Sequence, residues 1–136
     1  MKSGRWGSAD AYVYQGKEVF KVLAQRLDED QELQADMYLD VQRGQGDTTI
    51  AEHLLWRFAD RFRKKEWPGK RMPRVYYDPR ALEVNPSQKT SLHAKCIVVD
   101  RSATLVTSAN FTEAAQKRNI ELGALIKSAV FAERIV

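Results

Sequence analysis

A histidine and a lysine stand two residues apart, at His93 and Lys95, within the mostly apolar segment Leu92–Val99. On an extended strand, residues two apart point to the same face, so an imidazole and an ammonium are expected side by side. A lysine in an apolar strand is costly unless it meets an anion. An imidazole can attack phosphorus and leave again, and an ammonium can hold phosphate oxygens. The pair therefore predicts phosphate chemistry.

Two downstream segments carry further polar residues: Thr107–Thr112 contains Ser108 and Asn110, and Asn119–Gly123 contains Glu121. With the H-x-K-x4-D spacing of the first segment, they resemble the phospholipase D superfamily, in which that motif precedes a small-polar segment ending in Asn and then a Glu in a strand. The sequence of residues 108–115, Ser-Ala-Asn-Phe-Thr-Glu-Ala-Ala, also resembles the phospholipase D-like protein of bacterial DISARM phage-defence systems.

The resemblance implies a role for each polar residue of the motif. His93 would be the nucleophile that forms a phosphohistidine, and Lys95 would hold the non-bridging oxygens. Asn110 would donate a further hydrogen bond to those oxygens, with Ser108 as a weaker candidate. Glu121 would hold the second imidazole nitrogen and fix its tautomer.

The motif aspartate, Asp100, is expected to have a structural role. Strand parity puts it on the face opposite His93, and Asp100-Arg101-Ser102 is typical of a turn between two strands. We therefore expect it to orient the chain and not to take part in the chemistry.

The motif occurs only once, although phospholipase D-like sites use two histidines, one attacking while the other protonates the leaving oxygen. His53 has no companion lysine and is a poor candidate for that acid. A two-fold homodimer would set two His93 side chains face to face. Alternatively, the chain is one half of a longer two-motif protein.

The expected fold class is α/β, with a mixed β-sheet between helices as in a phospholipase D-like half-unit. Hydrophobic spacing predicts helices at 16–27, 50–65 and 129–136, and strands at 11–14, 37–41, 75–77, 93–99, 103–107 and 120–126. Thr49 and Glu52 match a capping box at the start of the second helix.

Length and composition bound the class of protein. The 136 residues, 43% apolar and 29% charged, fit one domain over 1–136, with termini that look truncated. No apolar run could span a membrane, so stable membrane insertion is not expected. The single cysteine, Cys96, cannot form an internal disulfide, which favours the cytoplasm. We expect no cofactor, and no metal, because no cluster of ligand residues lies near the motif.

A basic segment precedes the motif. Between Arg57 and Arg74 there are eight basic residues and two acidic ones, in a chain of net charge +4. Lysine and arginine gain affinity for nucleic acid by displacing counterions, although a solvated helix face has the same pattern. The candidates for nucleic-acid binding are Arg57, Arg61, Lys64, Lys65, Lys70 and Arg71. Of the three tryptophans, packing is the favoured role and base stacking the alternative.

Three functions remain open. The first is a metal-independent phosphodiesterase, a nuclease on DNA or RNA, that works through a phosphohistidine. The second is the same chemistry on a phospholipid headgroup, as hydrolase or transphosphatidylase. The third is a catalytically idle nucleic-acid-binding module of a defence or repair assembly. The motif recognises a phosphodiester and does not identify what is attached to it.

Overall fold

The computed structural model describes residues 5–10, 13–14 and 16–136. A six-stranded mixed sheet forms its centre, in the order β4-β3-β1-β5-β6-β8. The strands are β1 (Arg5–Asp10), β3 (Gln34–Leu39), β4 (Arg74–Tyr76), β5 (Cys96–Val99), β6 (Ala103–Thr107) and β8 (Gly123–Lys127). A separate pair joins β2 (Val13–Tyr14) to β7 (Phe111–Thr112). The predicted α/β class is confirmed.

Strand direction decides which residues meet at each edge of the sheet. β3 runs parallel to β1 and β4, whereas β5 runs antiparallel to β1 and β6. The carboxyl ends of β1, β3 and β4 therefore lie at the same edge as the start of β5 and the end of β6. We call this the motif edge, because His93 and Lys95 immediately precede β5.

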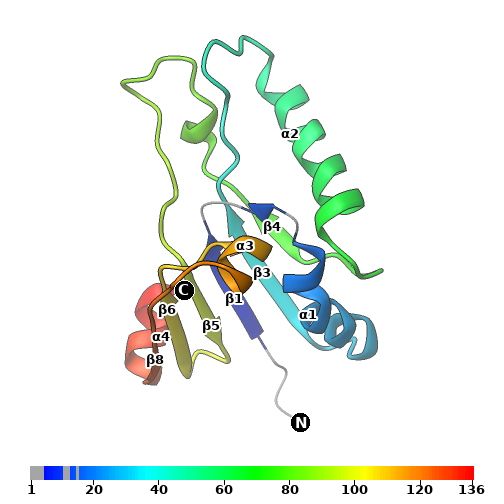
Figure 1. Ribbon diagram of the computed structural model, residues 1–136, viewed down its shortest axis with the longest axis vertical. Coiled ribbons are helices and arrows are strands. Elements are labelled where there is room, and N and C mark those ends of the chain that lie inside the picture. The colour runs from blue at the N-terminus through cyan, green and yellow to red at the C-terminus, as the bar shows by residue number, and fades with distance from the viewer. Residues whose placement is uncertain (1–4, 11–12, 15) are drawn as a thin grey trace.

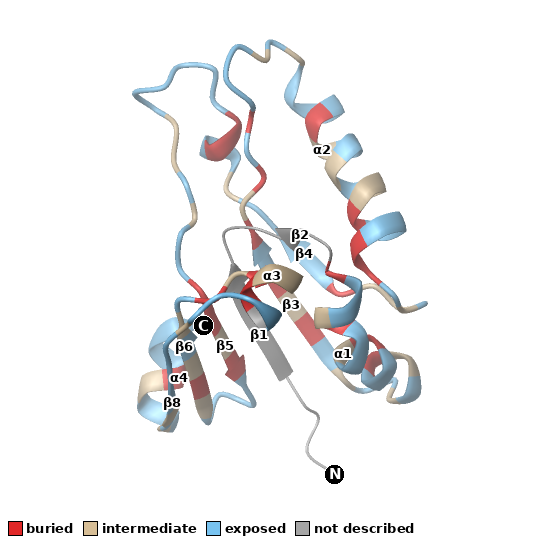
Figure 2. Cartoon of the chain, in the orientation of Figure 1, coloured by how far each residue is buried: buried red, intermediate tan, exposed pale blue. Residues whose placement is uncertain are grey.

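The main core lies between helix α1 (Lys17–Glu29) and strand β3. β3 alternates buried and more exposed residues (Figure 2), and its buried Ala35, Met37 and Leu39 belong to the same cluster as residues of the helix. Helix α1 contributes Phe20 and Leu27 to the same cluster. Burying aliphatic and aromatic side chains of this size stabilises a fold by roughly 1.5 to 3 kcal/mol each.

An arm extends from the motif edge (Figure 1). It contains helix α2 (Ala51–Arg61), a π-helical turn (Phe62–Glu66), and a 3-10 turn (Pro79–Leu82) in the returning segment. A small core of Val41, Leu54 and Leu82 holds the two sides of the arm together.

Two buried polar side chains stabilise the arm, one within it and one where it meets α1. Arg43 donates from Nε to the Leu82 carbonyl at 2.7 Å and from Nη1 to the Asp47 carbonyl at 2.8 Å. Glu66 accepts a 2.6 Å hydrogen bond from the backbone N–H of Gly16, where α1 begins. A carboxylate favours a helix start because it satisfies an unpaired amide and faces the positive end of the helix dipole.

Two short helices complete the fold. Helix α3 (Glu113–Lys117), which the sequence did not predict, follows β7 and begins at Thr112, whose hydroxyl accepts from Ala115 N. Helix α4 (Ala129–Ile135) packs against β6 and buries Ala132, close to the predicted 129–136 helix.

Several predicted boundaries were wrong. Helix α2 begins after Ile50 without a side-chain cap, because the N-cap residue is an isoleucine and the predicted capping residue, Thr49, bonds to Asp47 instead. β5 begins at Cys96 and β8 at Gly123, so His93, Lys95 and Glu121 lie in the segments before the strands. Parity along an ideal strand therefore does not decide where these three side chains point. Of the predicted 11–14 strand, residues 11–12 lie outside the described residues.

The β5–β6 hairpin turns through two non-glycine residues in left-handed conformation, Asp100 at φ 50° and Arg101 at φ 49°. Ser102 N donates to the Val99 carbonyl at 3.0 Å and closes the turn. Such hairpin turns favour Asn-Gly because a Cβ is strained at positive φ. Asp100 thus lies at the far end of β5 from Lys95.

We predict that Arg101→Gly raises the free energy of unfolding by about 0.5 to 1 kcal/mol, because it removes a Cβ at positive φ. Arg101→Ala is the matched control, since it removes the same charge but keeps the Cβ. Urea unfolding followed by circular dichroism measures both. Equal stabilisation by the two variants would show that charge, and not backbone conformation, is responsible.

Candidate active site

Lys95 is buried, with 9% of its surface exposed, and its backbone continues the β5–β6 ladder by accepting from Thr107 N at 3.0 Å. Its Nζ donates to the carbonyl of His93 at 3.0 Å. The His93 side chain is exposed. His93 is therefore open to solvent, and the ammonium of Lys95 is held against the main chain that carries the histidine.

Asp40 holds the segment that leads into His93, a contact that the sequence reasoning missed. It follows the last residue of β3 at the motif edge, and its carboxylate accepts from Leu92 N at 3.2 Å and from Ser91 Oγ at 3.1 Å. Gln42 Nε2 donates to the same carboxylate at 2.7 Å. The available signal was an aspartate at the carboxyl end of a parallel strand, where sites of α/β sheets gather.

Glu121 is held by two neighbouring side chains. Ser108 Oγ donates to Oε2 at 2.5 Å and Asn119 Nδ2 donates to Oε1 at 3.1 Å. These hydrogen bonds, helped by the charge of Lys95, lower the pKa of Glu121 below its ordinary value. The carboxylate is therefore ionised at neutral pH, beside the buried ammonium.

Ser108 was predicted as a weaker candidate for binding phosphate oxygens, and in the structure its side chain contacts Glu121. Its hydroxyl is directed to Glu121 and accepts from Leu122 N at 3.1 Å. These two hydrogen bonds orient the carboxylate of Glu121. The predicted hydrogen bond from Glu121 to His93 is not formed within one chain in the described residues, where the Glu121 partners are Ser108 and Asn119.

Asn110 lies between β6 and β7 and is half-buried. Its Oδ1 is buried without a hydrogen-bond partner among the described residues. A buried carbonyl oxygen without a partner loses roughly 1 to 3 kcal/mol of solvation, so such an atom at a site is well placed to accept from a ligand or an ordered water. The structure places Asn110 on the loop that also carries Ser108.

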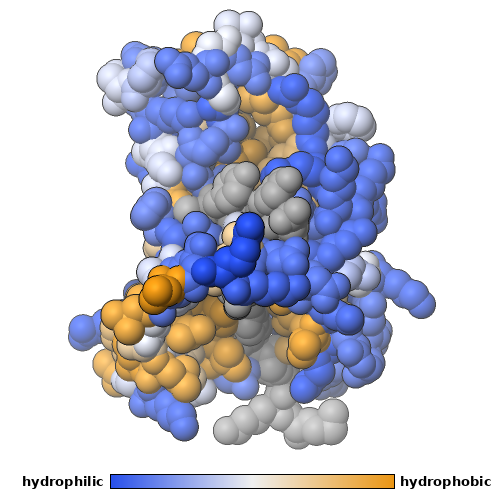
Figure 3. Space-filling view, viewed as in Figure 1, coloured by the Kyte–Doolittle hydropathy of each residue, from blue (hydrophilic) through white to orange (hydrophobic). Residues whose placement is uncertain are grey.

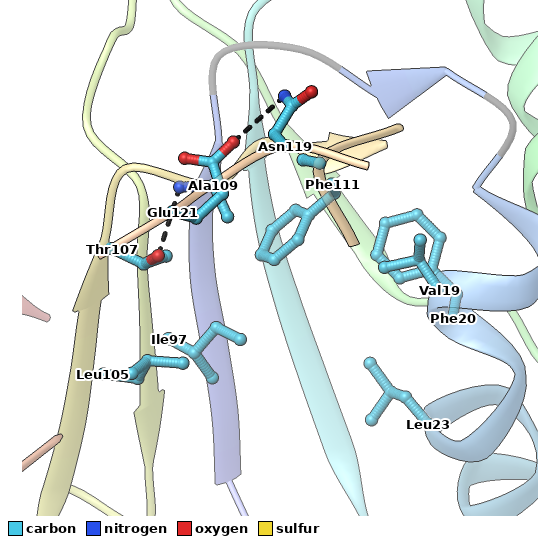
Figure 4. A pocket seen from close by; sticks show the side chains of 11 residues that line it. Val19, Phe20, Leu23, Ile97, Leu105, Thr107, Ala109, Phe111, Asn119 and Glu121 are labelled. Atoms are coloured by element: carbon cyan, nitrogen blue, oxygen red, sulfur yellow. Dashed lines mark hydrogen bonds between the residues drawn. The ribbon is translucent and has the colours of Figure 1, made fainter. Parts of the chain in front are cut away.

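A cavity of about 520 Å³ opens next to Glu121 (Figure 4). Its floor is apolar and comes from α1, β5 and β6, through residues such as Leu23, Ile97 and Leu105. Asn119, Glu121 and Thr107 supply polar groups. The acidic end of the candidate site therefore adjoins an apolar surface.

The six basic candidates do not form one set. Arg71 donates to the carbonyls of Leu27, Asp30 and Leu33 at 2.5, 2.6 and 3.1 Å, so its guanidinium closes the end of α1 and is not offered to a ligand. Arg61 lies over the Phe58 ring at 5.6 Å. The remaining four have exposed side chains: Arg57, Lys64, Lys65 and Lys70.

Two of these exposed cations are paired on the surface. Arg57 contacts Asp47 at 3.2 Å, and Lys64 contacts Asp60 at 2.6 Å. Exposed ion pairs contribute little to stability, typically below about 1 kcal/mol. A phosphate could therefore replace the carboxylate of Asp47 or Asp60 as the partner of the cation.

Within the described part of the chain, no three His, Cys, Asp or Glu side chains are grouped so that they could hold a metal ion. No helix in that same part has the length and apolar character needed to cross a membrane.

Comparisons with known proteins identify the family. A family described as "Cardiolipin synthase, PLD-like domain" matches residues 48–136, which is more than half of the chain. The chain therefore belongs to the phospholipase D-like domain family, and the resemblance seen in the motif is confirmed. No curated protein matches the chain at a significant level.

Solved structures agree on the fold. NucT from Helicobacter pylori aligns with a TM-score of 0.60 and 10% identity, covering 96% of this chain and 73% of that one. Nuc, a phospholipase D family member from Salmonella typhimurium, gives 0.57 and 20%, covering 96% and 72%. Phosphatidylserine synthase of Haemophilus influenzae gives 0.56 and 16%, covering 96% and 31%.

We predict that Ser108→Ala raises the pKa of Glu121 toward its ordinary value, because it removes the hydroxyl that contributes most to the lowering. The carboxylate would then take up its proton at a higher pH than in the wild-type chain. NMR titration of the labelled Glu121 carboxyl measures the change, and Ser87→Ala, an exposed serine elsewhere, is the control. An unchanged titration would contradict the assigned hydrogen bond.

Proposed function

We propose that the protein is a metal-independent phosphodiesterase, a nuclease that cleaves DNA or RNA through a phosphohistidine. The observation that carries the proposal is the position of His93, which is exposed at the motif edge and whose carbonyl accepts a hydrogen bond from the ammonium of buried Lys95. Glu121, Ser108 and Asn110 come to the same edge from the segments that follow β6. Family membership supports the phosphodiester chemistry, and the basic Arg57–Arg74 segment supports a nucleic-acid substrate.

The reaction proceeds by two displacements. A neutral His93 nitrogen attacks phosphorus, a P–N bond forms and the bond to the leaving oxygen breaks, while a second histidine gives that oxygen its proton. Water then attacks the phosphohistidine and passes its proton to the second histidine, and the P–N bond breaks. Throughout both steps, Lys95 would stabilise the negative charge on the non-bridging oxygens.

The second histidine comes from another copy of the chain in this proposal. Ile120 and Leu122 flank Glu121 and are 103% and 82% exposed, and Leu125 on β8 is 62% exposed. Figure 3 shows hydrophobic side chains gathered over the β5–β6–β8 end of the sheet. Aliphatic side chains this exposed beside a site favour a partner surface. Within one chain, Glu121 is bonded to Ser108 and Asn119 and not to His93. In the proposed two-fold dimer, each His93 would instead meet the Glu121 carboxylate of the other copy.

The alternatives lead to different measurable results. Phospholipid cleavage has the support of fold similarity to a phosphatidylserine synthase. An idle binding module would hold nucleic acid without turnover. A second motif within a longer chain would replace the homodimer. We also propose a cytoplasmic location, because Cys96 is buried and free.

His93→Ala and Lys95→Ala are predicted to lower cleavage of single-stranded DNA in EDTA by about a thousandfold or more, because the nucleophile or the oxygen-binding charge is lost. Lys21→Ala, on the exposed side of α1, is the matched control and is expected to cleave at the wild-type rate. Gel electrophoresis of labelled oligonucleotides measures cleavage. Equal cleavage by wild type and His93→Ala would refute the mechanism, and no cleavage by any chain would favour the idle module.

Leu122→Asp is predicted to convert a dimer of the 15.6 kDa chain into monomers and to abolish cleavage, because a charge enters the apolar contact beside Glu121. Val22→Asp makes the same change at a 73% exposed site on α1 and is expected to leave the dimer intact. Light scattering gives the mass of each variant. A monomeric variant that cleaves at the wild-type rate would contradict the shared site.

A further inference from the structure

Trp56 on α2 is 68% exposed, more than any other aromatic side chain that the structure describes. Its neighbours on the helix explain the direction in which it points. Leu54 is buried, and Leu55 and Phe58 pack against the small core of the arm. The opposite side of α2 therefore carries the indole outward. A tryptophan gains much from burial, so exposure to this extent is unusual unless a ligand covers the ring.

The indole borders a shallow cavity of about 670 Å³. Thr49, Glu52, His53, Trp56 and Arg57 line it. The cavity thus combines a flat aromatic surface with hydrogen-bonding groups and a guanidinium. Figure 1 shows α2 along the outside of the arm, away from the sheet.

Positive charge continues from this cavity along α2 and into the π-helical turn that follows it. Arg57 and Lys64 have 56% and 68% of their side chains exposed, and Arg63 and Lys65 are exposed as well. Glu66, one of the two acidic residues in the basic segment, is buried against Gly16 and does not reach this surface. The charge therefore complements a polyanion that passes over the indole.

The surface also lies in the right direction from the candidate active site. The chain leaves the carboxyl end of β3 to build α2, enters the sheet again at β4, and leaves it a second time before it reaches His93 and the start of β5. Because β5 is antiparallel to β1, the end of β3 and the start of β5 lie at the same edge of the sheet. An extended strand leaving the phosphate site along the arm would approach α2.

We propose that Trp56 is a stacking platform for a base of single-stranded nucleic acid, with Arg57, Arg63 and Lys64 holding the neighbouring phosphates. The inference rests on the proposed function for the identity of the ligand as a nucleic acid. It adds that this nucleic acid is single-stranded. Every base has an aromatic face, so stacking on an indole does not require a particular sequence. In a duplex these faces are already stacked on each other, and the indole would have no free face to contact.

Binding is measured by fluorescence anisotropy with a labelled 15-nucleotide oligo-dT and with a duplex of the same length. The full chain carries His93→Ala so that the probes stay intact. Trp56→Ala is expected to weaken binding of the single strand at least about fivefold, and to leave duplex binding unchanged. Trp56→Phe, which keeps an aromatic face, is the matched control and is expected to lose no more than about twofold. Arg63→Gln is expected to lower the salt dependence of single-strand binding.

A second measurement separates this inference from the proposed function. Hydrolysis of bis(p-nitrophenyl) phosphate, which has no strand to stack, is compared between wild type and Trp56→Ala in the catalytically intact chain and is expected to be equal. Loss of single-strand binding only in Trp56→Ala supports the platform. The platform is overturned if Trp56→Ala binds the single strand as tightly as the His93→Ala parent chain does. It is also overturned if Trp56→Phe and Trp56→Ala weaken binding of the single strand and of the duplex equally. A wild-type chain that binds through Trp56 but hydrolyses nothing would refute the proposed function and leave the platform standing.

Discussion

The antiparallel pairing of β5 with its two neighbours determines where every group of the candidate site lies. The pairing with β1 puts the start of β5 at the edge where β3 ends, so that Asp40 can hold the segment before His93. The pairing with β6 brings Ser108 and Asn110 to the same edge by a single hairpin. The site thus depends on one local hairpin and on two long-range contacts, the β1–β5 pairing and the Asp40–Leu92 hydrogen bond.

The charged groups of the candidate site differ in how far they are buried. The ammonium of Lys95 is buried near the main chain, and the carboxylate of Glu121 is kept ionised by Ser108 and Asn119. His93 itself is exposed to solvent. A buried cation that already has a carbonyl partner needs little reorganisation when an anion arrives, which is the condition for electrostatic stabilisation of a transition state.

The sequence predicted the family and the α/β class, because these follow from residue types and spacing. The sequence was less successful in predicting the directions in which the side chains of the candidate site point. Glu121 and His93 were placed by strand parity, whereas both lie before their strands, where neighbouring side chains decide the geometry. Asp40 and the true partner of Ser108 were missed because each contact joins residues distant in the sequence, more than fifty apart for Asp40 and Leu92. Arg71 looked like any other surface cation until its three carbonyl partners were seen.

The exposure of Ile120 and Leu122 has a consequence for control of the protein in the cell. If these residues bind a second copy, the number of complete sites rises with the square of the concentration of free chains. A dilute chain would then present half-sites that hold a phosphate but cannot protonate a leaving group. Abundance alone would switch the protein between retaining a phosphodiester and cutting it, with no effector or modification required.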